Sequence, residues 1–320
     1  MKLANRLIGV AALLLSPLAI AATDKPECIA PAKPGGGFDL TCKLAQGGLE
    51  KVVTDPVRVT YMPGGIGAVA YNAIVAQRPG EGNTIVAVSS GSLLALAQGK
   101  FGKYNEHDVK WLAAMGTDYG MVAVRADSPY KTLKDLVAAM KQDPKKVVFG
   151  ASGTIGNQDW MKAALVARAA GVDHKTFRYV AFEGGGEALT ALLGGHVQVM
   201  TGDASEAIPH LQAGKIRILA VMADKRLDGV LKDIPTAKEQ GHDISWPIIR
   251  GFYMGPKVTS ADYDYWVKAF SKMLTTKEFS KLREERGLFP FSMTGAEFDA
   301  YAKKAVGDYG KLVKEFDLVK

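Results

Sequence analysis

One pattern recurs along the chain: an apolar stretch, then a glycine-rich loop, then a segment with helical periodicity. Short apolar stretches bounded by glycine and proline predict buried strands, and the 3.6-residue period predicts helices. The loops that follow such strands are residues 34–37, 63–67, 89–92, 150–156 and 184–186. Strands that alternate with helices predict an α/β fold with mainly parallel sheets.

Two breaks in this pattern predict two lobes. A strand over 121–124 ends in the polar segment 125–129, and a second break lies at 241–247. The chain then finishes in two amphipathic helices, over 260–274 and 296–316. Two lobes joined by two crossings form a cleft that hinge motion can close. The expected boundaries are 22–125 plus 246–320 for lobe 1 and 126–245 for lobe 2.

Residues 1–21 have the features of a secretory signal peptide. Lys2 and Arg6 precede an apolar stretch over 7–20, which is shorter than the roughly 20 residues that a membrane-spanning helix needs. Ala19-Ile20-Ala21 is a small-residue cleavage signal. A buried N-terminal helix, the alternative, does not explain this combination. We expect export to the periplasm, cleavage near Ala21 and an oxidising environment for the mature protein.

The two cysteines, Cys28 and Cys42, lie on either side of the first glycine loop. They are too few for a disulfide-dense scaffold or a zinc-finger array. One belongs to the expected strand and the other to the first turns of the following helix, and an oxidising compartment favours pairing. We predict a disulfide bond between them, with two buried free thiols as the alternative.

Composition and motifs exclude several functions. The 320 residues are 48% hydrophobic and 23% charged, as in globular proteins. The net charge of +7 is spread without basic clusters, so we expect no nucleic-acid partner. There is no P-loop, no nucleophile elbow, no dinucleotide fingerprint with its ribose-binding acid, and no metal-binding spacing among the five histidines. We expect no catalytic residue, cofactor or metal; a secreted α/β enzyme is the remaining alternative.

Glycine-rich loops that open helices present backbone N–H groups at the positive end of the helix dipole. Any one of these loops could be a tight turn and nothing more. Several in one chain favour anion binding for at least two of them. Glu183 and Glu187 flank the glycines at 184–186. They are candidates for an acid/base pair or, more simply, acids placed at a helix start.

Six segments together resemble a known family: residues 31–39, 62–67, 179–186, 191–197, 214–221 and 234–241. They are similar to the substrate-binding proteins of tripartite tricarboxylate transporters, the periplasmic receptors of the Bug type, and the resemblance covers the mature chain. Phe38, Ile155, Asp159-Trp160 and the bulky segment 246–251 depart from the general pattern. With Lys33, these departures resemble the citrate and tricarboxylate branch of the family.

The resemblance implies a two-lobed periplasmic-binding-protein-like α/β fold, type II-like, with a central ligand cleft. It implies an extracytoplasmic receptor that captures citrate or a related tricarboxylate and delivers it to a membrane permease with a large and a small subunit. We expect a monomer. A sensing module that presents the carboxylate to a signalling partner is the alternative function.

The resemblance also places one ligand carboxylate between the first lobe's loop 35–39 and the second lobe's loop 152–157. Asp39 is expected to cap its helix and shape the loop. Further ligand charges need partners, because an unpaired buried charge costs several kcal/mol. Arg250 and Lys33 are the candidates, with a hinge salt bridge as the alternative role of Arg250. The expected ligand-site residues are Lys33, Gly35, Gly36, Phe38, Asp39, Gly64, Gly65, Ser90, Gly91, Ser152, Gly153, Thr154, Asn157, Glu183, Gly184, Asp203 and Arg250.

Overall fold

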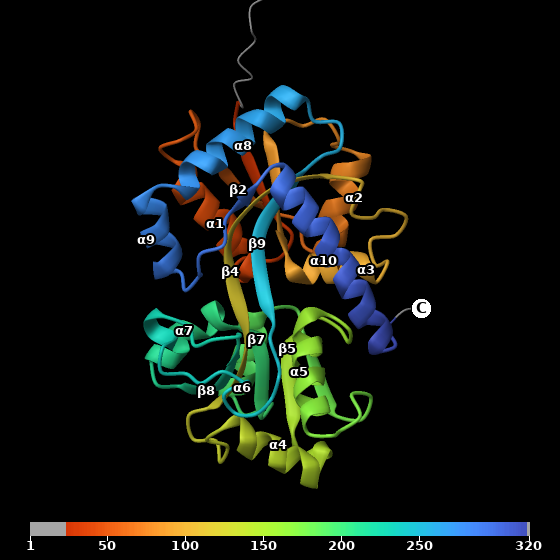
Figure 1. The fold of residues 1–320 in the computed structure, drawn as a ribbon, viewed down its shortest axis with the longest axis vertical. Helices are drawn as coiled ribbons and strands as arrows, with labels where there is room; N and C mark the ends of the chain where they lie inside the picture. Colours follow the sequence, from red (N-terminus) through yellow and green to blue (C-terminus); the bar gives the residue numbers. More distant parts are fainter. Residues whose placement is uncertain (1–23, 319–320) are drawn as a thin grey trace, which may run out of the picture.

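The computed structural model describes residues 24–318, which form two α/β lobes stacked along the long axis of the molecule (Figure 1). The expected α/β architecture with two lobes is confirmed. The expected signal peptide, residues 1–21, lies outside the described residues. Within the described range, none of the helices has the length and apolar character needed to cross a membrane.

Lobe 1, the upper lobe in Figure 1, is built from the first and the last parts of the described chain. Its strands are β1 (Glu27–Ala30), β2 (Arg58–Tyr61), β3 (Thr84–Ser89), the first part of β4 (Lys110–Arg125), β9 (Pro247–Met254) and β10 (Met293–Thr294). Its helices are α1 (Gly37–Leu49), α2 (Ala68–Ala76), α3 (Ser90–Ala97), α8 (Ser260–Leu274), α9 (Lys277–Glu285) and α10 (Ala296–Glu315). The strand β1 pairs in parallel with both β2 and β3.

Lobe 2 is built from the middle of the chain. Its strands are the second part of β4, β5 (Val148–Ser152), β6 (Arg178–Phe182), β7 (Val199–Asp203) and β8 (Ile216–Met222). Its helices are α4 (Leu133–Gln142), α5 (Gln158–Ala169), α6 (Gly185–Leu193) and α7 (Ala204–Gln212). The strand β5 pairs in parallel with β6 and β7.

The long strand β4 belongs to both lobes. Its residues from Lys110 to Tyr119 pair with β9, and those from Gly120 to Arg125 pair with β8. The sheet order is therefore continuous through the molecule, β2-β1-β3-β9-β4-β7-β5-β6. The partners of β4 change from β9 to β7 and β8 between Tyr119 and Gly120. This change comes before residue 125, the lobe boundary that we propose from the sequence.

The sheets are mixed, so the expectation of mainly parallel sheets was wrong for the centre of the fold. The chain crosses from lobe 1 to lobe 2 along β4 and returns along β9. These two strands consequently run in opposite directions, and each ladder they form is antiparallel. The parallel pairs lie toward the outer edges, where βαβ connections generate them.

A disulfide bond joins Cys28 and Cys42, as the sequence predicts. Both residues are fully buried in the core of lobe 1, in the same cluster as Trp266 and Phe270. The bond ties β1 to α1 on the two sides of the first glycine loop. In the chain-entropy model, closing a loop of this length stabilises the fold by about 3 kcal/mol.

The C-terminal helix α10 makes a further connection between the lobes. It packs on α3 and β4 and ends against lobe 2 (Figure 1). There Phe316 contacts the rings of Trp160 and His174, and Glu315 pairs with Arg168. The lobes are therefore held by two strands and by the end of one helix, and the helix contact was not expected from the sequence.

Candidate functional site

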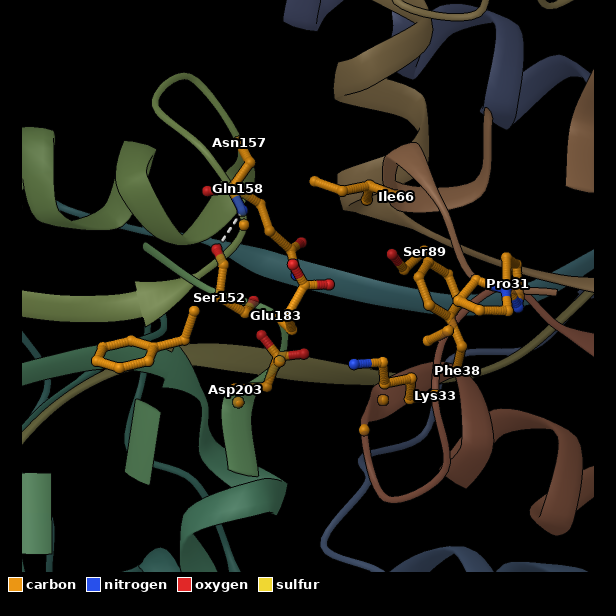
Figure 2. A pocket seen from close by; sticks show the side chains of 18 of the residues that line it. Pro31, Lys33, Phe38, Ile66, Ser89, Ser152, Asn157, Gln158, Glu183 and Asp203 are labelled. Atoms are coloured by element: carbon orange, nitrogen blue, oxygen red, sulfur yellow. Dashed lines mark hydrogen bonds between the residues drawn. The ribbon is translucent and has the colours of Figure 1, made fainter. Parts of the chain in front are cut away.

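A cleft of about 470 Å³ lies between the lobes (Figure 2). It is lined by the loops that follow β1 and β2 in lobe 1 and by those that follow β5 and β6 in lobe 2. In open α/β sheets, loops at the carboxyl ends of parallel strands form the ligand site. The cleft therefore lies where this topology places a binding site.

Asp39 shapes the loop between β1 and α1. Its buried carboxylate accepts hydrogen bonds of 2.8 Å each from the backbone N–H of Gly35, the Nζ of Lys43 and the hydroxyl of Tyr61. Burial by itself would raise the pKa of Asp39, but these hydrogen bonds outweigh it and lower the pKa below its ordinary value. The contacts are those of a residue that holds the loop, as expected, and Asp39 does not line the cleft.

The start of α1 faces the cleft through Gly36, Gly37 and Phe38. The N–H groups of a first helical turn have no partner within the helix, and they lie at the positive end of its dipole. Gly37 has no room for a side chain, because a Cβ there would lie 2.2 Å from Nη1 of Arg250. The loop thus brings backbone donors close to a buried guanidinium.

Ile66 contributes an apolar side chain from the loop after β2. It has a φ of 54°, which is uncommon for a β-branched residue. Its Cδ1 reaches toward lobe 2 and would lie 3.3 Å from a Cβ placed on Gly153. Figure 2 shows Ile66 pointing across the cleft toward the loop that carries Asn157. Ile66 therefore covers one side of the cleft with apolar surface.

Asn157 organises the opposite loop. Its side-chain oxygen accepts a 2.9 Å hydrogen bond from the backbone N–H of Trp160, which caps α5, and its side-chain nitrogen donates to the carbonyl of Ser152. The hydroxyl of Tyr179 donates to the carbonyl of Gly153 at 2.9 Å. Asn157 lines the cleft, but both of its polar atoms have partners within the loop. It therefore holds the loop in shape rather than offering free groups to a ligand.

The glycine loop after β6 opens α6. The backbone N–H of Glu183 donates to the carboxylate of Glu187 at 3.1 Å, and both exposed side chains line the cleft. Glu187 lies in the first turn of α6, where the helix dipole favours an acid, and it also accepts from an N–H group just before the helix. The contact favours the interpretation of Glu183 and Glu187 as acids at a helix start over their interpretation as an acid/base pair.

A buried cluster of charged groups forms the floor of the cleft, where the lobes meet. Nη2 of Arg250 donates to Asp118 at 2.9 Å and to Asp203 at 2.6 Å. Nζ of Lys162 donates to the other oxygen of Asp203 and to Asp159, each at 2.7 Å. Arg250 comes from lobe 1 and Asp203 and Lys162 come from lobe 2. The cluster is therefore an interlobe ion-pair network, and the salt-bridge alternative for Arg250 describes its contacts.

Burial and neighbouring charges set the protonation of the cluster. Burial raises the pKa of Asp118 and of Asp159. Burial would also raise the pKa of Asp203, but Lys162 and Arg250 outweigh it and lower that pKa. Glu206, next to the cluster, has a pKa raised to about 8 by burial and by Asp203, so it is protonated at neutral pH. The two cations are thus matched by protein carboxylates.

The structure brings most of the expected ligand-site residues together, but not all. The expected residues that line the cleft are Lys33, Gly36, Phe38, Gly64, Gly65, Ser152, Gly153, Thr154, Asn157, Glu183, Gly184, Asp203 and Arg250. Gly35 and Asp39 line a neighbouring groove instead. Ser90 holds β9 through Ile249 N–H at 3.0 Å, and Gly91 lies against the side chain of Gln158. Ser90 and Gly91 are thus structural neighbours of the cleft and not part of its lining.

Sequence reasoning missed several residues of the site. Gln158 lines the cleft, and its side-chain Oε1 is buried without a partner between residues 24 and 318. Ile66 and Glu206 also line it, while Asp118 and Lys162 belong to its floor. A signal existed for Asp118 and Lys162, because each is a charge inside an otherwise apolar stretch. Gln158, Ile66 and Glu206 carried no such signal.

The model of the family described as "Tripartite tricarboxylate transporter family receptor" matches residues 41–318. The chain belongs to this family. The receptor resemblance noted in the sequence is thereby confirmed, and the family consists of receptors rather than enzymes.

Known relatives agree with this family. The chain is 24% identical to the UPF0065 protein in the gbd 5' region of Cupriavidus necator, over 89% of this chain and 85% of the relative. It is 25% identical to a solute-binding protein of the same family from Polaromonas, with a TM-score of 0.66 and coverage of 91% and 98%. MatC from Rhodopseudomonas palustris, solved with bound malate, is 21% identical, with a TM-score of 0.78 and coverage of 90% and 98%. The sequence comparisons therefore agree on the family, and the solved structures share the fold that holds the cleft.

Proposed function

We propose that this protein is an exported, monomeric receptor that captures a small carboxylate in the interlobe cleft and delivers it to the permease subunits of a tripartite transporter. The observation that carries the proposal is the start of α1, where Gly36, Gly37 and Phe38 line the cleft and the first-turn N–H groups have no partner within the helix. An anion at a helix start gains charge-assisted hydrogen bonds. The polar loop at 152–157 faces the same space from lobe 2.

The charges around the cleft bear on which carboxylate binds. Lys33 is the lining cation without an acidic partner among residues 24–318, whereas Arg250 already serves Asp118 and Asp203. Two exposed acids, Glu183 and Glu187, also line the cleft. The sequence favours citrate or another tricarboxylate, but this charge balance favours a ligand with two negative charges. MatC, which has the same fold, holds malate.

We assign one ligand carboxylate to the start of α1 and the second to Lys33, on the same side of the cleft (Figure 2). Gln158 reaches into the cleft from α5 with an unpartnered side-chain oxygen. The oxygen and nitrogen of a glutamine amide can be interchanged by a flip, so Gln158 accepts from a ligand hydroxyl or donates to a carboxylate. A hydroxylated dicarboxylate would use all three contacts.

Calorimetry and thermal shift on the purified mature protein test the ligand class. We expect malate and succinate at pH 7 to raise the melting temperature, since ligand binding to the native state stabilises it. Citrate and tricarballylate, with a third charge, should bind more weakly. Tighter binding of citrate than of malate would restore the tricarboxylate assignment. Responses confined to sugars, nucleotides or cationic amines would refute the carboxylate receptor altogether.

Delivery to a permease has its own test. Membrane vesicles that contain the large and small permease subunits should take up labelled malate only when the loaded receptor is added. A variant that still folds but no longer binds malate, such as Phe38→Pro at the start of α1, serves as the control. Uptake that does not depend on the receptor, with binding intact, would argue for a role in sensing instead.

A further inference from the structure

A second cavity lies between the lobes, away from the cleft. It has a volume of about 570 Å³ and shares none of the lining residues of the cleft. Lobe 1 contributes α9 and the segment that follows it, and lobe 2 contributes Ile208 of α7 and the turn at Asp228–Leu231. Figure 1 shows α9 and α7 on the same side of the molecule, where the two lobes approach each other. Its size is within the usual range of small-molecule sites.

Arg283 is the distinctive residue of this cavity. It lies on α9, is 8% exposed, and lines the cavity. Its Nε is buried and has no hydrogen-bond partner between residues 24 and 318. In the same part of the chain no carboxylate forms an ion pair with its guanidinium. Burial accordingly lowers the pKa of Arg283, and the neighbouring Glu284 compensates only in part.

The surroundings hold the side chain of Arg283 in place. Its guanidinium lies 5.7 Å from the centre of the Phe279 ring, within the range of a cation–π contact. Its aliphatic part passes over Gly116 of β4, where a Cβ would come within 3.3 Å of Cδ. A buried cation without a counter-charge is unfavourable in a folded protein. The cavity therefore provides an ordered, unsatisfied site for one anion.

The other residues that line the cavity indicate the chemistry of the ligand beyond its charged group. Much of it is apolar, with Ile208, Val230, Leu231, Leu288, Phe289 and Pro290. Around the rim, Asp228, Glu284 and Glu285 are exposed acids, and Glu285 lies 3.8 Å from Lys281. Apolar surface favours an apolar body, and the acidic rim disfavours additional negative charges.

We propose that this cavity binds a monocarboxylate with an apolar body, such as an aromatic or short aliphatic acid, through the guanidinium of Arg283. This site would be separate from the carboxylate site in the cleft and does not depend on which ligand the cleft takes. Because both lobes line the cavity, its occupant contacts both of them.

Calorimetric titration of the full mature protein with benzoate tests the site, with benzyl alcohol as an uncharged ligand of similar shape. We expect benzoate to bind and benzyl alcohol to bind at least about tenfold more weakly, since it lacks the charge-assisted contact. Arg283→Gln should weaken benzoate binding at least about tenfold for the same reason. Lys277→Gln removes an exposed cation from the same helix that does not line the cavity, and it should leave benzoate affinity within about twofold.

Two further measurements make the outcome decisive. If Arg283→Gln does not fold, as judged by circular dichroism, Val230→Trp will replace it, because Val230 is 50% exposed and an indole there fills the cavity. Malate titrations of the same variants measure binding in the cleft separately. If malate does not bind, the benzoate titrations still test the second cavity. Benzoate binding that is absent from the parent protein, or unchanged in Arg283→Gln and Val230→Trp, or displaced competitively by malate, would overturn the proposal.

Discussion

Arg250 and Arg283 are two buried arginines at two interlobe cavities, with opposite electrostatic surroundings. Arg250 is 1% exposed and donates to two aspartates, whereas Arg283 is 8% exposed and has no acidic partner in the described part of the chain. Each side chain also packs against a glycine, Gly37 and Gly116 respectively. At both positions a glycine leaves room for the arginine side chain, but only Arg250 has carboxylates that compensate its charge.

The difference indicates two uses of a buried cation. Removing a charge from water costs several kcal/mol, which nearby carboxylates offset only when they are held in good geometry. Around Arg250 those carboxylates come from β4 and from β7, so the ion pairs join the two lobes. Around Arg283, no carboxylate in the described part of the chain fully compensates the cost of burying the charge, and a bound anion would do so. A paired arginine supports the fold, and an unpaired one is available for binding.

The largest effect is expected for Arg250→Ala. The change leaves Asp118 buried with only the Ser205 hydroxyl and two backbone N–H groups as donors, and it removes one of the two cations from Asp203. Breaking a buried ion pair from one side costs about 3–5 kcal/mol. Urea denaturation should show this loss in the free energy of unfolding.

Arg226→Ala is the matched control for that variant. Arg226 pairs with Glu239 at 2.9 Å, but its side chain is 50% exposed. Exposed pairs contribute about 0–1 kcal/mol, so stability should change little. Equal losses of unfolding free energy in Arg250→Ala and Arg226→Ala would mean that the buried ion pairs contribute no more than an exposed one.

A change of the opposite sign is expected for Arg283→Met. Methionine keeps the unbranched apolar stem over Gly116 and removes the unpaired charge. The free energy of unfolding should stay the same or rise by about 1 kcal/mol, because the change removes an uncompensated buried charge and loses only the cation–π contact with Phe279. The same urea experiment measures it. A loss as large as that of Arg250→Ala would show that Arg283 has an internal partner after all, and the comparison would fail.

Glu206 adds a pH dependence to the cleft. Its pKa of about 8 lies above the ordinary value of 4.5, so it is neutral below pH 8 and becomes an anion above it. Affinity for malate should therefore fall several-fold between pH 7 and pH 9, because the new charge repels the ligand. Calorimetry at both pH values measures this fall, and Glu206→Gln should abolish it. A flat profile in the parent protein would contradict the assignment.

The same shift of Glu206 affects stability with a definite sign. The folded state binds this proton more tightly than the unfolded chain does, so the stabilisation is complete below pH 4.5 and is lost as the pH rises through about 8. Denaturation curves of the parent protein and of Glu206→Gln across this range should diverge accordingly. Parallel curves would place Glu206 in solvent.

The smallest effect is expected at Lys33, the exposed cation of the cleft. Exposed charges interact weakly and are screened by salt. Lys33→Ala should weaken malate binding only a few-fold, more in low salt than in 0.5 M NaCl, with no change in the free energy of unfolding. Titrations at two salt concentrations measure this. A salt-independent loss of a hundredfold would mean that Lys33 acts as a buried partner, as Arg250 does for its aspartates.

Local sequence patterns predicted much of the fold, because they depend on residues close together in the chain. The helix over 260–274 has the bounds of α8, and the helix over 296–316 differs from α10 by one residue. The disulfide was predicted because the two cysteines lie within one strand–loop–helix unit, on either side of its loop. The glycine loops were found at the cleft because turns after parallel strands meet at one edge of a sheet. Asp39 was assigned to its own loop for a similar reason, since its partner Gly35 lies four residues away.

Contacts between distant segments were decided only by the tertiary structure. The sequence shows Arg250 as a cation among apolar residues, but not that Asp118 and Asp203 reach it from 132 and 47 residues away. It shows a short strand at 121–124, although β4 runs from Lys110 to Arg125 through both sheets. It does not distinguish Arg283 from any other arginine on an amphipathic helix. Charge pairing and burial depend on which segments meet in space, and hydrophobic periodicity specifies only the face that each segment buries.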